Sequence, residues 1–311
     1  HAYFGKWLRV LWERFPWGKQ IDRHGCDLFH STAHLSPGPM KTPMVLTVHD
    51  MTNFLFPQMY KWTNQINRCR QLKRGFRQAE RIIAVSKSTR DDLIRLFPEA
   101  KSKVRVIYEG ADPVFHPYPE VDRASIGIHF EEPFILWVGT TSPRKNLQGL
   151  LEAFREIHSR GCHPYLVFVG QRGWKDHSIF DFIHRHRLDH YIHLAGYQPH
   201  HKLPLYYSAC AAFVFPSLYE GFGLPVLEAM ACGAPVLASR NSSLPELVAG
   251  EESLFDPSDT RQLADKLQRL LESPVMREDL SRAGIEKARE FSWEKAARQT
   301  IEVYREICPQ S

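Results

Sequence analysis

The sequence predicts an α/β protein made of two doubly wound parallel sheets, and three observations support this fold class. Short apolar runs alternate with helical stretches in two successive series, as expected for parallel strands joined by crossover helices. A segment rich in proline, glycine and charge, residues 110–133, separates the two series and is interpreted as an interdomain linker. No apolar run reaches the ~20 residues that a membrane-spanning helix needs, in keeping with 43% hydrophobic and 24% charged residues.

The first series covers residues 27–108. Its apolar runs predict buried strands, and the stretches between them predict helices, the second of which follows the cap-type residue Ser86. The predicted strands are 27–30, 44–49, 81–86 and 104–108, and the predicted helices are 60–78 and 88–96.

The second series begins at Phe134. Its predicted strands are 134–139, 165–170, 191–196, 211–215, 235–238 and 253–255. Helices are predicted between them at 146–160, 178–187, 200–209, 225–231 and 244–249, and three more follow at 259–272, 276–290 and 293–307. In such sheets ligands bind at the carboxyl ends of the strands, so the loops that follow the strands are where we look for chemistry.

Residues 1–25 place apolar side chains such as Trp7 and Leu11 at roughly helical spacing among basic ones such as Arg9. Two interpretations remain open: a membrane-surface helix that grips a lipid-linked acceptor, or an ordinary helix packed on a sheet with its charges in water. We favour the second because Glu13 interrupts the basic face and the segment is short.

Charge and cysteine content set broad limits. A net charge of +5 is compatible with anionic nucleotide-sugars or an anionic membrane surface, and we interpret the basic residues as dispersed, which does not support nucleic-acid binding. The six cysteines are scattered without a Cys-x-x-Cys pair, as in a reduced cytoplasmic protein without a zinc site. The first residues show neither an initiator Met nor the apolar core of a signal peptide.

The stretch that carries most chemistry is residues 211–239, which reads as strand, glycine turn, short helix and strand. Glu220 precedes the turn, Pro225 is placed at the first helical position, and Glu228 lies inside the helix. Free N–H groups at such a helix start, with the helix dipole behind them, favour an anion such as a diphosphate. Each carboxylate can accept two sugar hydroxyls, although on spacing alone Glu228 could equally cap or pair within a surface helix.

This stretch resembles the signature of the family-four retaining glycosyltransferases of GT-B fold, with Glu-x7-Glu set in Pro-Ser-Leu-Tyr-Glu-Gly-Phe-Gly-Leu-Pro. The resemblance implies two Rossmann-like domains facing across a cleft. It implies that Glu220 faces the donor sugar and Glu228 the nucleotide ribose. The backbone lining the donor sugar and phosphates would be that of Gly221, Phe222, Gly223 and Leu224.

A second loop, Val138-Gly-Thr-Thr-Ser-Pro-Arg-Lys-Asn146, follows a predicted strand. A departing diphosphate needs its charge neutralised, and without a metal this requires fixed cations such as Arg144 and Lys145. The alternative is a pair of solvated loop cations. The loop resembles the family's phosphate-binding segment, which adds Gly139 and Thr140 to the expected donor site. Many relatives carry Arg where this chain has Thr140, so Arg144 is expected to substitute for it.

His49 ends a predicted strand in Thr47-Val-His-Asp50, where a side chain faces the ligand edge of the sheet. By resemblance it is the family's active-site His, close to the acceptor. Asp50 is an expected acceptor contact and His30 a weaker one, although with 16 histidines in the chain a structural role is the alternative. Residues 191–199 resemble the segment that meets the nucleobase, which makes Tyr197 an expected donor contact.

The resemblance also implies the domain organisation. We expect an acceptor-side domain over residues 1–120, a nucleotide-sugar-binding domain over 121–290, and a C-terminal helix over 291–311 that packs back on the first domain. The family pattern opens with a strand and a glycine-rich loop that residues 1–25 do not contain, so the first domain is expected to be incomplete. A truncated form, one piece of a split enzyme and a natural minimal variant all remain open.

Together these observations predict a retaining, metal-independent glycosyltransferase that moves a hexose from a donor of GDP-mannose or UDP-glucose type to a sugar or lipid-linked acceptor. Glycan or glycolipid synthesis is the expected setting, with His49, Arg144, Lys145 and Glu220 as catalytic residues. No cofactor is expected, and the predicted location is the cytoplasm, with peripheral contact at the inner face of the membrane. Two alternatives are a nucleotide-sugar-binding subunit that needs a partner chain for the missing elements, and a same-fold epimerase.

Overall fold

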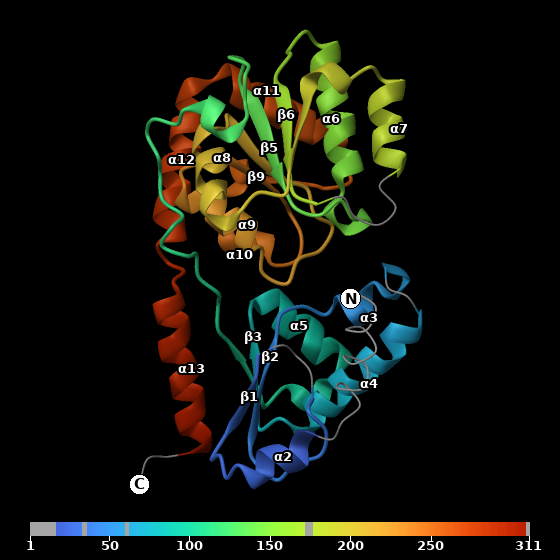
Figure 1. The fold of residues 1–311 in the computed structure, drawn as a ribbon, viewed down its shortest axis with the longest axis vertical. Coiled ribbons are helices and arrows are strands. Elements are labelled where there is room, and N and C mark those ends of the chain that lie inside the picture. Colours follow the sequence, from blue (N-terminus) through green and yellow to red (C-terminus); the bar gives the residue numbers. More distant parts are fainter. Residues whose placement is uncertain (1–16, 33–35, 60–61, 172–176, 309–311) are drawn as a thin grey trace. The chain divides into compact units, whose positions relative to one another are not determined.

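The structure, a computed structural model, describes residues 17–32, 36–59, 62–171 and 177–308. The chain forms two compact units (Figure 1). The first unit contains the described residues up to Tyr108 together with those from Lys295 onward, and the second unit is Glu109–Glu294. The chain therefore changes unit twice, at 108/109 and at 294/295.

The first unit is built on a four-stranded parallel sheet in the order β1-β2-β3-β4. The four strands of the first predicted series are confirmed: β1 Phe29–Ser31, β2 Met44–Val48, β3 Arg81–Ala84 and β4 Val104–Val106. The helices are α2 Trp17–Arg23, α3 Thr52–Leu55, α4 Trp62–Gln78, α5 Lys87–Leu96 and α13 Trp293–Ile307, with short 3-10 turns at Pro57–Met59 and Pro98–Ala100. As the sequence indicated, Ser86 caps α5 by accepting the Thr89 N–H at 3.0 Å.

Alternation along the central strands places apolar side chains on both faces of this sheet. On one face, Met44 and Leu46 of β2 pack with Leu72 and Phe76 of α4. On the other face, Val45 packs in a smaller cluster with Ile83, Ile107, Ala296 and Val303. Residues of α13 thus complete one side of the first unit's core.

The second unit contains a six-stranded parallel sheet in the order β10-β9-β8-β5-β6-β7. Its strands confirm the second predicted series: β5 Phe134–Val138, β6 Tyr165–Val169, β7 Ile192–Gly196, β8 Ala212–Phe215, β9 Val236–Ser239 and β10 Leu254–Phe255. From β5 the chain runs outward through β6 to β7, then returns to β8 on the other side of β5. This reversal creates a switch point between β5 and β8, where open α/β sheets bind ligands.

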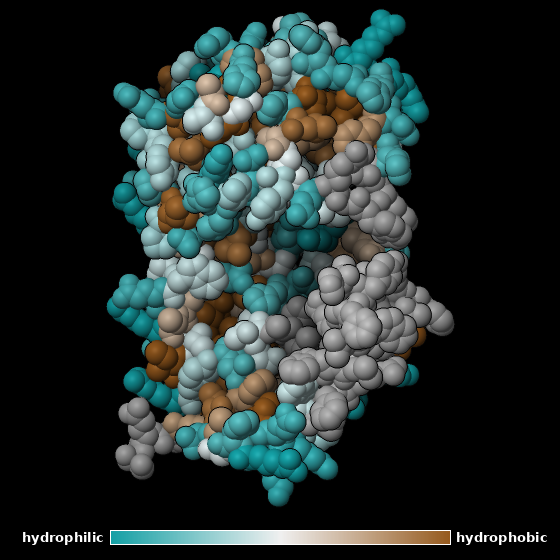
Figure 2. Space-filling model, in the orientation of Figure 1, coloured by the Kyte–Doolittle hydropathy of each residue, from teal (hydrophilic) through white to brown (hydrophobic). Residues whose placement is uncertain are grey.

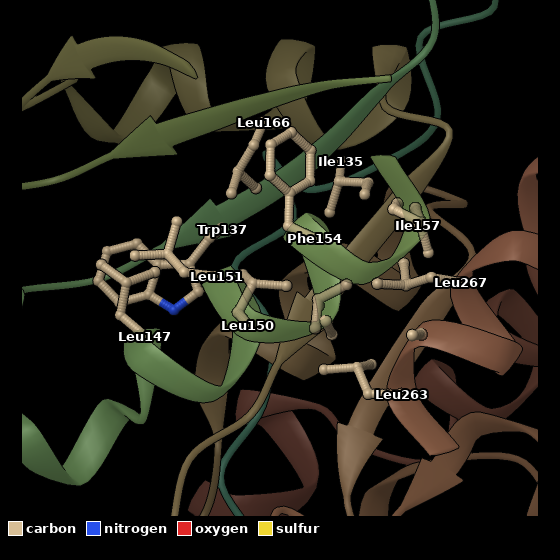
Figure 3. Packing of buried hydrophobic residues seen from close by; sticks show 14 of the residues in the cluster. Ile135, Trp137, Leu147, Leu150, Leu151, Phe154, Ile157, Leu166, Leu263 and Leu267 are labelled. Carbon is tan, nitrogen blue, oxygen red and sulfur yellow. The ribbon is translucent and has the colours of Figure 1, made fainter. Parts of the chain in front are cut away.

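Helices cover both faces of this sheet: α6 Leu147–Ser159, α7 His177–Arg185, α8 Leu203–Ala209, α9 Leu224–Ala231, α10 Leu244–Leu247, α11 Thr260–Glu272 and α12 Pro274–Ala288. Short 3-10 turns occur at Arg123–Ile126, Pro143–Lys145, Asp189–Tyr191, His200–Lys202 and Glu251–Ser253. Figure 3 shows the core on one face, where Leu150, Leu151 and Phe154 of α6 and Leu263 and Leu267 of α11 pack with Ile135, Trp137 and Leu166 from the strands.

The segment expected to be an interdomain linker, residues 110–133, belongs to the second unit. Its backbone groups are held by that unit's side chains. The Tyr206 hydroxyl donates to the Ile126 carbonyl at 2.6 Å, and the Tyr118 N–H donates to the Ser208 hydroxyl at 3.1 Å. A segment whose polar backbone groups are satisfied in this way packs on the domain rather than bridging two domains.

Most of the proposed membrane-surface helix would lie in residues 1–16, which are outside the described residues. Of the stretch 1–25, the structure describes only residues 17–25, which include α2. Among the described helices, none combines the length and the apolar character needed to cross a bilayer. On the face seen in Figure 2, hydrophobic residues gather in separate groups among hydrophilic ones.

Candidate active site

The two loops singled out in the sequence lie side by side at the switch point of the second unit. Residues 139–146 follow β5 and residues 216–223 follow β8, and these strands are neighbours in the sheet. Because both strands run in the same direction, their carboxyl ends lie at the same edge. Side chains 75 positions apart in the sequence are thereby brought into contact.

Three charged side chains form one cluster between these loops. Glu220 Oε1 lies 2.7 Å from Nη1 of Arg144 and 2.8 Å from Nζ of Lys145. The Lys145 ammonium also lies 4.5 Å from the centre of the Phe215 ring, a cation–π contact. The second oxygen of Glu220, Oε2, receives no hydrogen bond from any residue that the structure describes.

Burial and charge oppose each other in this cluster. Glu220 is only 8% exposed, and burial by itself would raise the pKa of its carboxyl, but Lys145 and Arg144 outweigh that effect and hold the pKa below its usual value. Burial lowers the pKa of the Lys145 ammonium, and Glu220 opposes this change. Glu220 is therefore held as a carboxylate beside two cationic groups.

The loop after β5, residues 139–146, is called the phosphate-type loop below, and it is shaped by close packing and by one unusual backbone conformation. Pro143–Lys145 forms a 3-10 turn that ends at Asn146, whose φ of 49° is left-handed. The Asn146 side chain donates to the Pro257 carbonyl at 3.0 Å, which holds this conformation in place. A Cβ on Gly170 would lie 1.8 Å from the Gly139 carbonyl oxygen, so only glycine permits this approach of β6 to the loop.

The signature helix α9 begins at Leu224, so Pro225 is its second residue rather than its first. Gly223 precedes the helix with a left-handed φ of 114°. A Cβ there would lie 2.8 Å from Cδ2 of Leu244 on α10. The left-handed conformation therefore favours glycine at this position.

Glu228 lies on α9 in a different setting from Glu220. Its Oε2 accepts a hydrogen bond from the buried Tyr207 hydroxyl at 3.1 Å, and no described residue hydrogen-bonds to its Oε1. Burial raises the pKa of the Glu228 carboxyl, and the Tyr207 hydrogen bond opposes this only in part. Tyr207 could not be predicted from the sequence, because a partner supplied by another helix leaves no spacing signal.

Thr140 and Tyr197, both expected at the donor site, are exposed at the ends of β5 and β7. Tyr197 is 68% exposed, and no contact joins it to the Arg144, Lys145 and Glu220 cluster. Its assignment to the nucleobase stays a prediction.

The histidines of the first unit differ in what they contact. His49 Nε2 donates to the Thr32 carbonyl at 2.8 Å, while Asp50 accepts the Thr52 N–H at 2.8 Å and the Thr52 hydroxyl at the start of α3. Both ring nitrogens of His30 are engaged, by the Tyr304 hydroxyl at 2.6 Å and by the Thr47 hydroxyl at 2.8 Å.

His30 therefore joins α13 to β2 through both of its ring nitrogens. The roles expected for His30, His49 and Asp50 toward an acceptor stay predictions.

A hollow of about 490 Å³ lies beside the phosphate-type loop, between the start of α6 and α7. Leu147, Ile179 and Phe182 form its apolar lining, and Asn146 and Arg185 add polar groups. Arg144, Lys145 and Glu220 do not line it. Within the described residues, no group of three His, Cys, Asp or Glu side chains is arranged to hold a metal ion.

Solved structures of GT-B glycosyltransferases share this pair of parallel α/β units, which places the chain in that fold class. Sucrose-phosphate synthase from Thermosynechococcus elongatus superposes with a TM-score of 0.80 at 27% identity, over 94% of this chain and 76% of that one.

The chain belongs to the group 1 glycosyltransferases: residues 120–287 match the family model "Glycosyl transferases group 1", and residues 1–115 match "Glycosyltransferase Family 4". O-antigen chain mannosyltransferase B of Escherichia coli is 32% identical over 266 residues, 84% of this chain and 70% of that protein. The serotype-specific mannosyltransferase WbdA of Escherichia coli is 27% identical over 283 residues, and this chain spans only about a third of its length (34%).

Proposed function

We propose that this chain transfers a hexose, with mannose as the first candidate, from a nucleoside-diphosphate sugar to a hydroxyl of a growing glycan. The observation that carries the proposal is the convergence of Arg144 and Lys145 on Glu220 at the switch point. Mannose is placed first because the two relatives described above are named mannosyltransferases.

Each charged group has a distinct task in this proposal. Arg144 and Lys145 neutralise the negative charge that builds up on the diphosphate as it departs. Glu220 keeps Oε1 on the two cations and offers Oε2 to donor-sugar hydroxyls. Glu228 keeps Oε2 on Tyr207 and offers Oε1 to the ribose hydroxyls.

The transfer is proposed to retain the configuration of the sugar without a metal ion. The acceptor oxygen bonds to C1 of the sugar as the bond from C1 to the phosphate oxygen breaks, and the acceptor proton passes to that phosphate. The two fixed cations take the electrostatic role that a divalent ion has in other transferases. Proton NMR of the first product should show the anomeric configuration of the donor, and EDTA should leave the rate unchanged.

Donor hydrolysis and binding across a panel of UDP- and GDP-sugars are the first test. We expect free sugar to be released from GDP-mannose. With a mannoside acceptor present, we expect the sugar to be transferred with its configuration at C1 retained. Binding without turnover until a second chain is added would favour the alternative, a nucleotide-sugar-binding subunit or truncated form. Release of an epimerised nucleotide-sugar would favour the epimerase, and no binding to any donor would contradict the proposed site.

Peripheral contact with an anionic membrane is a second part of the proposal, and α4 supports it. Against the expectation of dispersed basic residues, α4 carries five exposed cations and no acidic residue. The five cations are Arg68, Arg70, Lys73, Arg74 and Arg77. No described acidic side chain pairs with them, whereas on α5 Arg90 pairs with Asp91 and Arg95 with Asp92.

Vesicle binding tests this part separately. Each Lys or Arg near an anionic surface contributes about 1 kcal/mol, so replacing Arg70, Lys73 and Arg74 together by Gln should weaken binding to phosphatidylglycerol vesicles roughly 100-fold. The paired cations Arg90 and Arg95, replaced by Gln, are the matched control. Equal binding by both variants would contradict this role for α4.

A further inference from the structure

The backbone of residues 218–222 is held by hydrogen bonds on both of its sides. From the phosphate-type loop, the Arg144 carbonyl accepts the Leu218 N–H at 2.8 Å, and the Arg144 guanidinium donates to the Tyr219 carbonyl. The same residue that contacts the Glu220 carboxylate therefore also holds the backbone just before it.

On the other side, three consecutive residues after β9, Asn241–Ser243, contact this backbone. The Asn241 side-chain amide donates to the Leu218 carbonyl at 2.9 Å. The Ser242 hydroxyl accepts the Glu220 N–H at 2.9 Å. The buried Ser243 hydroxyl is shared between the carbonyls of Glu220, at 3.0 Å, and Phe222, at 2.6 Å. No motif in the sequence distinguishes these three residues.

The triplet is itself held in an uncommon conformation. Ser242 has a φ of 47°, in the left-handed region that residues with a Cβ rarely adopt. The Leu244 N–H donates to the Asn241 carbonyl at 3.2 Å, which closes the turn into α10. Leu244 then packs so closely on Gly223 that a Cβ there would lie 2.8 Å from it. Leu218 and Gly223, at the two ends of this stretch of backbone, thus both contact residues 241–244.

The Ser243 hydrogen bond also sets the direction of a neighbouring donor group. In a trans peptide the carbonyl of one residue and the N–H of the next lie in one plane and point in opposite directions. Because the Phe222 carbonyl is directed at Ser243, the Gly223 N–H points away from Ser243. This N–H lies at the start of α9, where a helix favours an anion.

We propose that Asn241, Ser242 and Ser243 are positioning residues for the donor site: they fix the loop that presents Glu220 and the Gly223 N–H to the donor. They act through the backbone of residues 218–222 and not by touching the substrate. The inference rests on the proposed function for its kinetic consequence, but the positioning itself is a property of the loop.

The test uses two substitutions that remove a hydroxyl and one that restores it, all in the full chain. Ser243→Ala removes the hydroxyl shared by two carbonyls, and Ser242→Gly removes a hydroxyl while tolerating the left-handed backbone. Ser243→Thr retains the hydroxyl. Hydrogen–deuterium exchange of peptides covering residues 216–224 reports on the loop, and GDP-mannose hydrolysis reports on the site.

Ser243→Ala and Ser242→Gly should each speed amide exchange in residues 218–224 about tenfold, because the protecting contacts are lost. They should lower kcat/KM roughly 100-fold, as expected for small displacements of groups that must be aligned with the reacting atoms. Ser243→Thr should restore most of both losses.

Ser273→Ala is the matched control, because Ser273 caps α12 through the Met276 N–H in the same unit but does not touch the loop. It should lower the melting temperature and leave exchange in residues 216–224 and kcat/KM unchanged. Wild-type exchange and kinetics in Ser243→Ala, or a Ser243→Thr variant no better than Ser243→Ala, would overturn the inference. If the unmodified chain binds no nucleotide-sugar, the proposed function fails, and the exchange measurement alone still decides the positioning.

Discussion

Glu220 and Glu228 belong to one short signature, yet the fold gives the two carboxylates opposite electrostatic settings. Glu220 lies between two cations, which hold its pKa below the usual range. Glu228 has a tyrosine hydroxyl for a partner, and burial raises its pKa. Each keeps one oxygen engaged by the protein and the other without a partner among the described residues.

The difference teaches that residue type and spacing do not fix the charge behaviour of a site. A lowered pKa in the folded state makes the contribution of Glu220 to stability complete at neutral pH and lost as the pH falls through the folded value. The raised pKa of Glu228 gives the opposite pH dependence: its contribution to stability is present at acid pH and is lost as the pH rises through the pKa of the folded state. In our proposal Glu228 binds ribose as a carboxylate, and its ionisation therefore lowers the free energy of unfolding.

The largest expected effect comes from removing the charge of Glu220. Glu220→Gln leaves Arg144 and Lys145 without their shared carboxylate, so it should cost about 3 kcal/mol of unfolding free energy and lower turnover roughly 1000-fold. Urea denaturation and GDP-mannose hydrolysis measure the two effects. Glu290→Gln is the control, because Glu290 is exposed and its ion pair with Lys287 of α12 involves neither of the two loops. Near-normal turnover in Glu220→Gln would remove this carboxylate from the site.

Lys145→Met should rank second, because it removes one of two cations but keeps an apolar side chain beside Phe215. We expect turnover to fall roughly 100-fold, with a larger effect on kcat than on donor KM, since the developing charge is greatest in the transition state. Steady-state kinetics across donor concentrations distinguish the two parameters. A change confined to KM would instead indicate that Lys145 serves ground-state binding.

Glu228→Gln should have a smaller effect with a distinct pH signature. Donor affinity of the unmodified protein should rise as the pH increases through the raised pKa of Glu228, because the ionised form is the hydroxyl acceptor. In Glu228→Gln this slope should vanish and affinity should fall roughly tenfold, while thermal stability at neutral pH should not decrease. Calorimetric titration with GDP at several pH values measures the slope. An unchanged slope in the variant would assign the titration to another group.

Tyr207→Phe should have the smallest effect, because it removes one hydroxyl and keeps the ring in its pocket. The loss of a hydrogen bond that favours the ionised form should shift the pH midpoint of donor binding upward and weaken binding about threefold. Tyr206→Phe is a neighbouring control, since its hydroxyl contacts the Ile126 carbonyl and not Glu228. Identical pH profiles for Tyr207→Phe and the unmodified chain would contradict an orienting role for Tyr207.

Much of the architecture could be predicted from the sequence, because parallel strands buried on both faces give near-continuous apolar runs such as Phe134–Val138 and Ala212–Phe215. The signature and the Arg-Lys loop also indicated which stretches form the site. Their contact follows from topology: β5 and β8 are neighbours because, after β7, the chain returns to the other side of β5.

The remaining features of the site could not be predicted, because they depend on side chains that bind backbone groups. Ser243 leaves no trace in spacing, since its partners are carbonyls that every residue possesses. His30 followed a strand pattern similar to that of His49, but α13 brings Tyr304 to its ring. Residues 110–133 have the composition of a linker, and side chains far along the chain hold them on the second unit.

Helix α13 determines the order in which the two units can complete their folding during synthesis. The core cluster that contains Val45 and Ile83 is completed by Ala296 and Val303, and Glu306 pairs with Arg81 and Arg105. During synthesis the second unit, contiguous over residues 109–294, can finish folding as soon as it leaves the ribosome. The first unit emerges earlier but must wait, with one face of its sheet exposed, until residues 296–307 follow. Of these two units, the one that is translated earlier is thus the one that is completed later.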